Sequence, residues 1–515
     1  METNQRMRPY LYVISLLCAV VLWTSCRKDF EYAPSAGNLE FSRDTVYLDT
    51  IFSNIGSSTY SLKVYNPTRD DVLIPSIRLD QGQESGYRLN VDGMAGKEFR
   101  DVSLLAQDSL FIFIETTLDI ANTNETAFLY TDAILFDSGS FLQEVQLVTL
   151  VKDAVFLYPN TLTDGTTETI TVGLDGDGRE IRVEGFYLSD SQLNFTNEKP
   201  YVVYGYAAVP PDKQLSMDPG TRAHFHKDSG IFVTEGASIQ INGALSTDPL
   251  LLENEVVFEG DRLEPEFSDI PGQWGTIWIS PGSANNTIEY LTIKNATVGL
   301  LVEGNRELQS PTLTLNNSQI HNSSSVNLWA RHASIVSENS VLGTAGNTSL
   351  YCNVGGDYTF THATIANYWT QGFRQGTALQ IDNFSQSTSE DLINASFVNC
   401  IIDGNMALEL SLNSNGSNEF NYSFINCLLK FRDNNEDFSQ NPLYDFGNTD
   451  IYDQILLNQE VDFINTSDNN FNIGQSSAAI DNANFEAAQA VPFDIKGINR
   501  ATAPDIGAYE NITPE

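Results

Sequence analysis

Histidines and basic side chains in the middle of the chain are the residues whose types and spacing could do chemistry. His224 and His226 are separated by one residue, so on a strand they would face the same way, as two ligands of one metal ion do. No third ligand stands near them in the sequence. We therefore expect a structural role for this pair and predict no metal site.

A polysaccharide lyase or hydrolase would need a fuller set of groups. A lyase needs a base, often Arg or Lys, and a cation that neutralises a uronate, whereas a hydrolase needs paired carboxylates on one concave face. Lys294, His321 and Arg331 could line one face, but from positions that are not equivalent in the repeat described below. The remaining basic candidates are Arg306 and His332. We predict no catalytic residue.

Two acidic stretches suggest sites that a structural role explains better. The loop from Asp175 to Glu180 places carboxylates on a glycine-kinked backbone, but it lacks the third acidic position and the distal Glu of a calcium loop. We expect a polar turn and no cofactor, with Ca²⁺ at this loop as the alternative. Near the C-terminus, ion pairs and bonds to backbone amides can pin an irregular segment over the last coil of a fold. We expect such a cap from Asp494, Arg500, Asp505 and Glu510.

The charge of the chain limits its partners. It has 515 residues with 27 Lys and Arg against 67 Asp and Glu, which gives a formal net charge of −40. Such a surface repels phosphate backbones, so we exclude nucleic acid as a partner. A polysaccharide or an envelope protein remains compatible with this charge.

The N-terminus has the form of an export signal. Arg6 and Arg8 precede an apolar stretch that is too short for a comfortable transmembrane span. It ends in Leu22-Trp-Thr-Ser-Cys26, which resembles a lipobox whose cysteine is acylated, although Trp23 replaces the usual aliphatic residue. We predict lipidation at Cys26, a membrane anchor, and an outer-membrane lipoprotein facing the periplasm or the cell surface.

Residues 38–152 show short strands separated by turn signals, a spacing typical of a β-sandwich. From about Pro200 a different pattern begins, with an apolar residue at the end of each strand recurring every 22 to 37 residues. One such coil cannot bury its own apolar face, but stacked coils can. The reference residues are Ile293, Ile320, Leu342, Ile365, Ile402 and Leu429.

Three columns of side chains accompany these references. The position three residues before the reference is asparagine in four coils and His362 in a fifth. The asparagine amides can hydrogen-bond along the coil axis. These asparagines are Asn317, Asn339, Asn399 and Asn426. Two residues before it, small residues include Cys400 and Cys427, for which we expect stacked thiols because parallel Cβ vectors fit disulfide geometry poorly. Five residues before it lies an aromatic stack of Phe360, Phe397 and Phe424.

The sequence resembles two known families. Residues 52–67 look like Hydin-type immunoglobulin-like domains of secreted bacterial proteins, which usually act as spacers or interaction surfaces. A second likeness is to a right-handed parallel β-helix lipoprotein family of Bacteroidota-like bacteria with the pectin-lyase-like fold. It rests on residues 199–205, 215–221, 237–243, 273–277, 285–290 and 298–302, and on a closing segment at 441–443, 478–481, 493–497 and 504–510. This resemblance implies the fold and no particular activity.

These observations predict an all-β chain, with an immunoglobulin-like β-sandwich followed by a right-handed parallel β-helix. We expect a non-catalytic glycan-binding, protein-binding or structural module, with a polysaccharide lyase or glycoside hydrolase as the alternative. The predicted parts are a lipoprotein signal peptide (1–26), a tether (27–37), the sandwich (38–152), a transition and N-cap (153–199), the β-helix (200–432) and a capping segment (433–515).

Overall fold

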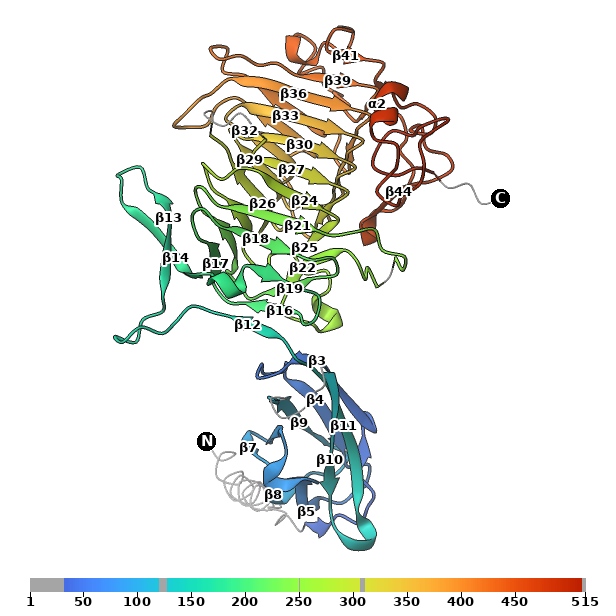
Figure 1. The fold of residues 1–515 in the computed structure, drawn as a ribbon. Helices are drawn as coiled ribbons and strands as arrows, with labels where there is room; N and C mark the ends of the chain where they lie inside the picture. The colour runs from blue at the N-terminus through green and yellow to red at the C-terminus, as the bar shows by residue number, and fades with distance from the viewer. Residues whose placement is uncertain (1–31, 120–126, 250, 306–310, 512–515) are drawn as a thin grey trace, which may run out of the picture. The chain divides into compact units, whose positions relative to one another are not determined.

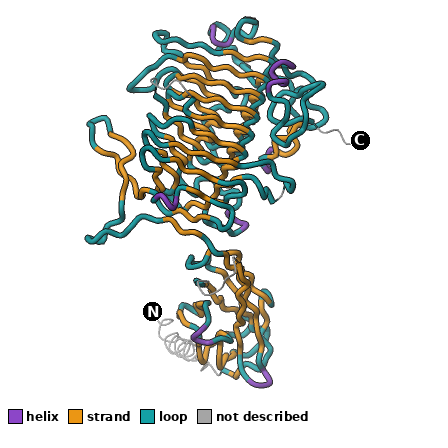
Figure 2. The backbone as a smooth tube through the Cα atoms, in the orientation of Figure 1, coloured by secondary structure: helices purple, strands orange, loops and turns teal. Residues whose placement is uncertain are grey.

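A computed structural model describes residues 32–119, 127–249, 251–305 and 311–511 (Figure 1). The predicted leader and the lipidation site Cys26 lie outside the described residues. The chain divides into two units, Met1–Lys152 and Asp153–Glu515. Both consist of strands and loops, which confirms the predicted all-β class; Figure 2 shows how little helix the described chain contains. Within the described residues, no helix has the length and apolar character needed to cross a membrane.

The first unit is a sandwich of two sheets around one apolar core. Alternation of side chains along each strand puts residues such as Leu62, Val64 and Ile112 inside, fully buried. One sheet contains β1 (Ala33–Pro34), β3 (Thr45–Phe52), β5 (Val72–Leu79), β8 (Glu98–Leu104), β10 (Ala127–Phe136) and β11 (Gln143–Lys152). The other contains β2 (Glu40–Phe41), β4 (Tyr60–Tyr65), β6 (Tyr87–Val91), β7 (Met94–Gly96) and β9 (Ser109–Thr116).

The second unit is a parallel β-helix, in which the chain passes through three sheets in turn and each strand pairs with the strand one coil later. Sheet 1 contains β12 (Val155–Leu157), β16 (Tyr201–Val203), β19 (Arg222–Phe225), β22 (Val256–Gly260), β25 (Leu291–Lys294), β28 (Gln319–His321), β31 (Val341–Leu342), β34 (Thr364–Asn367), β37 (Ile401–Gly404), β40 (Leu428–Leu429) and β42 (Leu456–Leu457).

Sheets 2 and 3 complete each coil. Sheet 2 contains β13 (Thr169–Leu174), β14 (Glu180–Tyr187), β17 (Tyr206–Val209), β20 (Gly230–Val233), β23 (Ile277–Ile279), β26 (Val298–Glu303), β29 (Val326–Arg331), β32 (Thr348–Asn353), β35 (Leu379–Asp382) and β38 (Leu410–Asn413). Sheet 3 contains β15 (Asn194–Phe195), β18 (Gln214–Met217), β21 (Ser238–Asn242), β24 (Asn286–Glu289), β27 (Leu313–Asn316), β30 (Ser334–Glu338), β33 (Gly356–Thr361), β36 (Leu392–Val398), β39 (Ser423–Ile425) and β41 (Tyr452–Asp453).

The coils begin earlier than the sequence pattern indicates. β12 pairs with β16 and β15 pairs with β18, so a first coil already forms within the residues predicted as a transition. The antiparallel hairpin β13–β14 interrupts this coil and hides its period. Asp175 and Gly178 form the turn of that hairpin, where Asp175 Oδ1 accepts the backbone N–H groups of Asp177 and Arg179 at 2.9 and 2.8 Å.

The C-terminal segment also differs from the prediction. Only its first part follows the coil end, where β41 pairs with β39 and β42 pairs with β40. The rest carries β43 (Phe463–Asn465), β44 (Asn470–Ile473) and α2 (Phe485–Ala490), and it lies along the side of the β-helix (Figure 1). Tyr509 reaches back to Gln319, with 3.1 Å between the hydroxyl and the amide oxygen. The segment therefore covers several coils and not the last one alone.

Candidate functional site

The outer face of sheet 2 carries a column of large side chains. Strand alternation buries Ile277 and Ile279 inside the coil and leaves Trp278 pointing outward. Parallel register then aligns one outward residue from each successive coil. The aromatic column, as we name it, comprises Phe232, Trp278, Leu301, Trp329 and Tyr351.

Ring contacts join neighbours within the aromatic column. Phe232 meets Trp278 edge to face with ring centroids 5.3 Å apart, and Trp329 stacks on Tyr351 at 5.8 Å. Phe232 is buried, whereas Trp278, Trp329 and Tyr351 are partly exposed. The two ring pairs, with Leu301 between them, form an extended apolar strip on the outside of the protein.

A second outward column holds these rings in place through polar contacts. Glu303 and Arg331 are register partners, joined by an ion pair of 2.7 Å, and Glu303 also accepts the indole N–H of Trp278 at 2.8 Å. One coil on, the Tyr351 hydroxyl donates to Asp382 at 2.8 Å and accepts from Asn353 at 3.0 Å. Trp278 and Tyr351 are therefore held in place before any ligand arrives, which lowers the entropy cost of binding.

The electrostatics of this face favour an uncharged ligand. The charge of Arg331 is balanced by Glu303, and Asp382 accepts hydrogen bonds from Gln380 at 2.9 Å and Asn413 at 2.6 Å. Burial and the neighbouring Asp382 raise the pKa of Tyr351, so its hydroxyl stays protonated and can donate. An anionic chain would meet two carboxylates and only one paired cation here.

The basic residues considered as catalytic groups lie on two different sheets. Lys294 and His321 are direct register partners on sheet 1, so the expectation of non-equivalent positions was wrong for these two, whereas it holds for Arg331. Arg331 belongs to sheet 2, and Arg306 lies outside the described residues. Lys294 Nζ pairs with Glu259 at 2.5 Å, and burial lowers the pKa of His321 to about 4. His321 lines a cavity of about 620 Å³, and its Nδ1 has no hydrogen-bond partner among the described residues.

His224 and His226 do not share a ligand position. The Nδ1 atom of His224 lies 3.2 Å from the carbonyl oxygen of Gly260, while His226 Nδ1 lies 2.8 Å from the carboxylate of Asp261. Among the described residues, no cluster of three His, Cys, Asp or Glu side chains could hold a metal ion.

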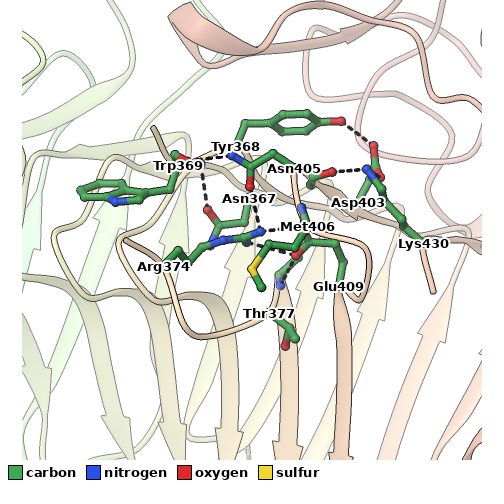
Figure 3. Close-up of polar contacts among 12 residues, drawn as sticks. Asn367, Tyr368, Trp369, Arg374, Thr377, Asp403, Asn405, Met406, Glu409 and Lys430 are labelled. Atoms are coloured by element: carbon green, nitrogen blue, oxygen red, sulfur yellow. Dashed lines mark hydrogen bonds and ion pairs between the residues drawn. The ribbon is translucent and has the colours of Figure 1, made fainter. Parts of the chain in front are cut away.

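A buried ion pair joins the loop between β34 and β35 to the loop between β37 and β38, and sequence reasoning missed it. Figure 3 shows Arg374 reaching to Glu409, with Nη2–Oε1 and Nη1–Oε2 distances of 2.6 and 3.0 Å. Glu409 also accepts the backbone N–H of Met406 at 2.7 Å and of Ala378 at 2.9 Å. All four acceptor positions of the carboxylate are therefore used, which suits a brace and not a catalytic acid.

The residues around this ion pair are also joined by hydrogen bonds. Asn405 accepts from Arg374 at 2.9 Å and donates to the Trp369 carbonyl at 2.7 Å. Tyr368 donates to Asp403 at 2.5 Å, and Lys430 Nζ lies 3.4 Å from the same carboxylate (Figure 3). Burial raises the pKa of Glu409, while Arg374 opposes that shift. No sequence periodicity marks this network, because its members come from loops of unequal length.

The predicted columns take up defined places inside and at one corner of the β-helix. The rings of Phe360, Phe397 and Phe424 stack at 5.4 and 5.1 Å, and Tyr452 extends the stack at 5.6 Å. The six reference residues are register partners from coil to coil. Cys400 and Cys427 are buried free thiols, with the Cys400 backbone N–H 3.4 Å from the Cys427 sulfur.

The asparagine column does a different job from the one expected. Only one bond joins two of its asparagines, from Asn339 to Asn317 at 2.9 Å, while Asn399 meets His362 at 2.9 Å. Other amide groups donate to the C-terminal segment, from Asn339 to the Phe493 carbonyl at 2.9 Å and from Asn426 to the Asn482 carbonyl at 3.0 Å. All four asparagines have φ between 48° and 56°, so the turn itself selects them.

The acidic residues of the closing segment organise its own backbone. Asp494 accepts from the N–H groups of Lys496, Ile498 and Glu510 at 2.7 to 2.9 Å. Arg500 is fully buried, with its Nε 3.1 Å from Glu510 and its Nη2 3.0 Å from the Gly507 carbonyl oxygen. Asp505 accepts backbone N–H groups of Asp481 at 2.8 Å and Asn511 at 2.7 Å. Burial raises the pKa of Glu510 to about 7, and nearby Asp505 adds to this effect.

Comparisons with known proteins give only distant likenesses. No family model and no curated protein matches the chain. Among solved structures, the periplasmic alginate epimerase AlgG matches with 10% identity over 55% of this chain and 78% of its own, at a TM-score of 0.19. A PapD-like domain of human CEP192 matches with 11% identity over 24% of this chain and 91% of its own, at 0.15.

A third structure, the periplasmic chaperone SfaE, matches with 12% identity over 22% of this chain and 57% of its own, at a TM-score of 0.16. Scores this low carry no argument about activity. The chain's own strands and register define its class, an all-β protein that joins an immunoglobulin-like sandwich to a right-handed parallel β-helix. The feature that distinguishes this chain within that fold class is the aromatic column on the outside of sheet 2.

Proposed function

We propose that this chain is a non-catalytic envelope protein that binds a neutral polysaccharide along the aromatic column. The observation that carries the proposal is the alignment of Trp278, Trp329 and Tyr351 on one outward face, with the indole N–H of Trp278 bound to Glu303 and the Tyr351 hydroxyl bound to Asp382. Sugar rings have apolar C–H faces that aromatic faces cover, and hydroxyls at their edges that carboxylates and amides bind.

The coil repeat suits a polymer better than a small molecule. Adjacent parallel strands are about 4.8 Å apart, so the outward positions of the column recur at a fixed interval. Leu301 separates the ring pair Phe232–Trp278 from the ring pair Trp329–Tyr351. A chain lying along the column would contact several rings at once, and many weak contacts would add up. Balanced charges at Glu303 and Arg331 favour a neutral chain over a uronate.

The predicted location at the outer membrane is the second part of the proposal. An acyl anchor at Cys26 would hold the protein on the outer membrane, and the sandwich would act as the spacer between anchor and β-helix. A lyase or hydrolase activity remains the competing function. Such an activity would release reducing ends or unsaturated uronates. The carboxylates of Glu409 and Asp494 accept backbone N–H groups, so neither is free to act as an acid or a base.

Affinity gel electrophoresis tests the proposal. Purified protein would be run through gels that contain neutral polysaccharides (β-glucan, mannan or xylan) or anionic alginate. We expect retardation by at least one neutral polymer and loss of about tenfold in affinity for Trp329→Ala, because one aromatic contact contributes on the order of 1.4 kcal/mol. Tyr47→Ala, an exposed aromatic on the sandwich, is the matched control and should keep full retardation.

Two results would count against this function. Equal retardation of Trp329→Ala and the parent protein would remove the aromatic column as the binding surface. Turnover of a polysaccharide by the purified protein, detected as new reducing ends, would replace binding by catalysis.

A further inference from the structure

A cavity of about 760 Å³ lies at the first coils of the β-helix, beside the start of the aromatic column, because Val183 and Tyr206 in its lining pack against the buried cluster that contains Phe232. The hairpin β13–β14 supplies one wall through Val183 and Glu184. The turns that follow β16 and β19 supply the others, including Tyr204 and His226. A volume of this size lies within the usual range for small-molecule sites.

Backbone geometry brings these turns together. Gly205 adopts φ +66°, and a Cβ there would lie 2.9 Å from the Glu184 carbonyl oxygen, so only glycine lets the turn approach the hairpin. On the next coil Asp228 adopts φ 57° in the turn that carries His226 and Lys227. The turn at residues 204–205 and the longer turn at 226–229 therefore each contain a residue with positive φ, and both place polar side chains on one cavity wall.

His226 is held in a defined orientation at this wall. Its Nδ1 lies 2.8 Å from Asp261 Oδ2, and the side chain of Asp261 is only 9% exposed whereas that of His226 is 50% exposed. A carboxylate at Nδ1 fixes the tautomer with the proton on Nδ1, which leaves the lone pair of Nε2 as an acceptor. The ring of Tyr204 packs against the imidazole, with centroids 4.6 Å apart.

Tyr204 adds a donor to this acceptor. Burial, with the nearby Asp261, raises the pKa of Tyr204 to about 12, so its hydroxyl keeps its proton. Tyr206 is held protonated in the same way, with a pKa of about 12. The charged groups at the wall are Glu184, Lys227 and Asp228, which together disfavour an anion.

We propose that this cavity is a second binding site, which takes a single neutral sugar ring whose hydroxyl donates to Nε2 of His226. The chemistry fits, because a neutral pyranose presents hydroxyl donors and acceptors to the histidine and tyrosine groups and a C–H face to the aromatic wall. The site does not depend on the aromatic column, since a monosaccharide is too short to need it.

Saturation-transfer NMR with glucose, galactose, mannose and N-acetylglucosamine tests the proposal on the full chain. Two variants separate the two nitrogens. His226→Asn keeps an amide N–H near the position of Nδ1 and loses the acceptor, whereas His226→Gln keeps an amide near the position of Nε2. We expect at least one neutral sugar to bind, about fivefold weaker binding for His226→Asn, and binding within about twofold for His226→Gln, as loss of one hydrogen bond implies.

Arg100→Ala, an exposed residue of the sandwich, is the control and should bind as the parent does. Glucuronate, the anionic counterpart, should not bind. The proposal is overturned if none of the four sugars binds, if His226→Asn binds as tightly as the parent, or if both His226 variants lose binding equally. Retardation by polysaccharide gels reports on the aromatic column separately, so either site can fail while the other stands.

Discussion

At the scale of single residues, left-handed turns explain the asparagines that mark the coils. Asn317 adopts φ 48° and makes one ladder contact, as acceptor from Asn339 at 2.9 Å. Asparagine tolerates this backbone conformation better than most residues with a side chain. The spacing of the asparagines in the sequence predicts the column. It does not reveal why asparagine stands there, because sequence spacing contains no information about φ.

Two substitutions at Asn317 separate the turn from the hydrogen bond. Asn317→Gly loses only the acceptor, whereas Asn317→Ala also places a Cβ in the left-handed region. We expect the alanine variant to be less stable than the glycine variant by about 1 kcal/mol in urea unfolding. Equal unfolding midpoints for the two variants would show that the conformation does not select asparagine.

The buried pair of Arg374 and Glu409 makes a larger prediction. Their side chains are 3% and 0% exposed, so removing one partner strands the other charge in the interior. We expect Glu409→Gln to lower the free energy of unfolding by about 3 kcal/mol. Glu98→Gln, which breaks an exposed pair with Arg100, should change it by less than about 0.5 kcal/mol. A loss at Glu409 no larger than at Glu98 would contradict the role as a brace.

At the scale of elements, regular strands were predictable and irregular ones were not. The period from Ile293 to Leu429 follows from alternation and stacking, and each reference residue lies in register with the next. The first coil was missed because the β13–β14 hairpin interrupts its period. The path of the C-terminal segment was missed because its contacts are individual hydrogen bonds, such as that from Asn339 to the Phe493 carbonyl.

The pH dependence of this segment can be checked at Glu510. Its folded pKa of about 7 lies above the ordinary value of 4.5, so the folded state binds a proton that the unfolded state has released. The stabilisation is fully present below about pH 4.5 and is lost as pH rises through about 7. Glu510→Gln removes this titration, so we expect its stability to fall less between pH 5 and 7, by up to about 1.4 kcal/mol per pH unit.

Chemical unfolding of both proteins at several pH values measures this difference. The two curves should coincide below about pH 4.5 and separate above it. Parallel curves across the whole range would mean that Glu510 does not titrate there.

At the scale of the whole molecule, the proposed address rests on Cys26, outside the described residues. We expect cells fed an alkyne-labelled fatty acid to label the parent protein and not Cys26→Ser, because an acyl chain on this thiol is the proposed anchor. The variant should also leave the membrane fraction. Equal labelling of both proteins would place the lipid on another residue. Labelling of neither would contradict the acyl anchor.

The aromatic column was not predicted from the sequence. Trp278, Trp329 and Tyr351 lie at unequal spacings in the chain, and only the register of sheet 2 aligns them. The column could have been found by extending the repeat alignment to the outward positions of a second strand in each coil.

Tryptophan fluorescence during titration with a neutral polysaccharide that retards the protein tests binding along the aromatic column. Trp278 and Trp329 stand on the proposed binding face, while Trp274 is buried in the coil interior. We expect a saturable change in emission that is lost in the Trp278→Phe/Trp329→Phe double variant. A change that persists undiminished in that variant, or its absence in the parent protein, would contradict binding along the aromatic column.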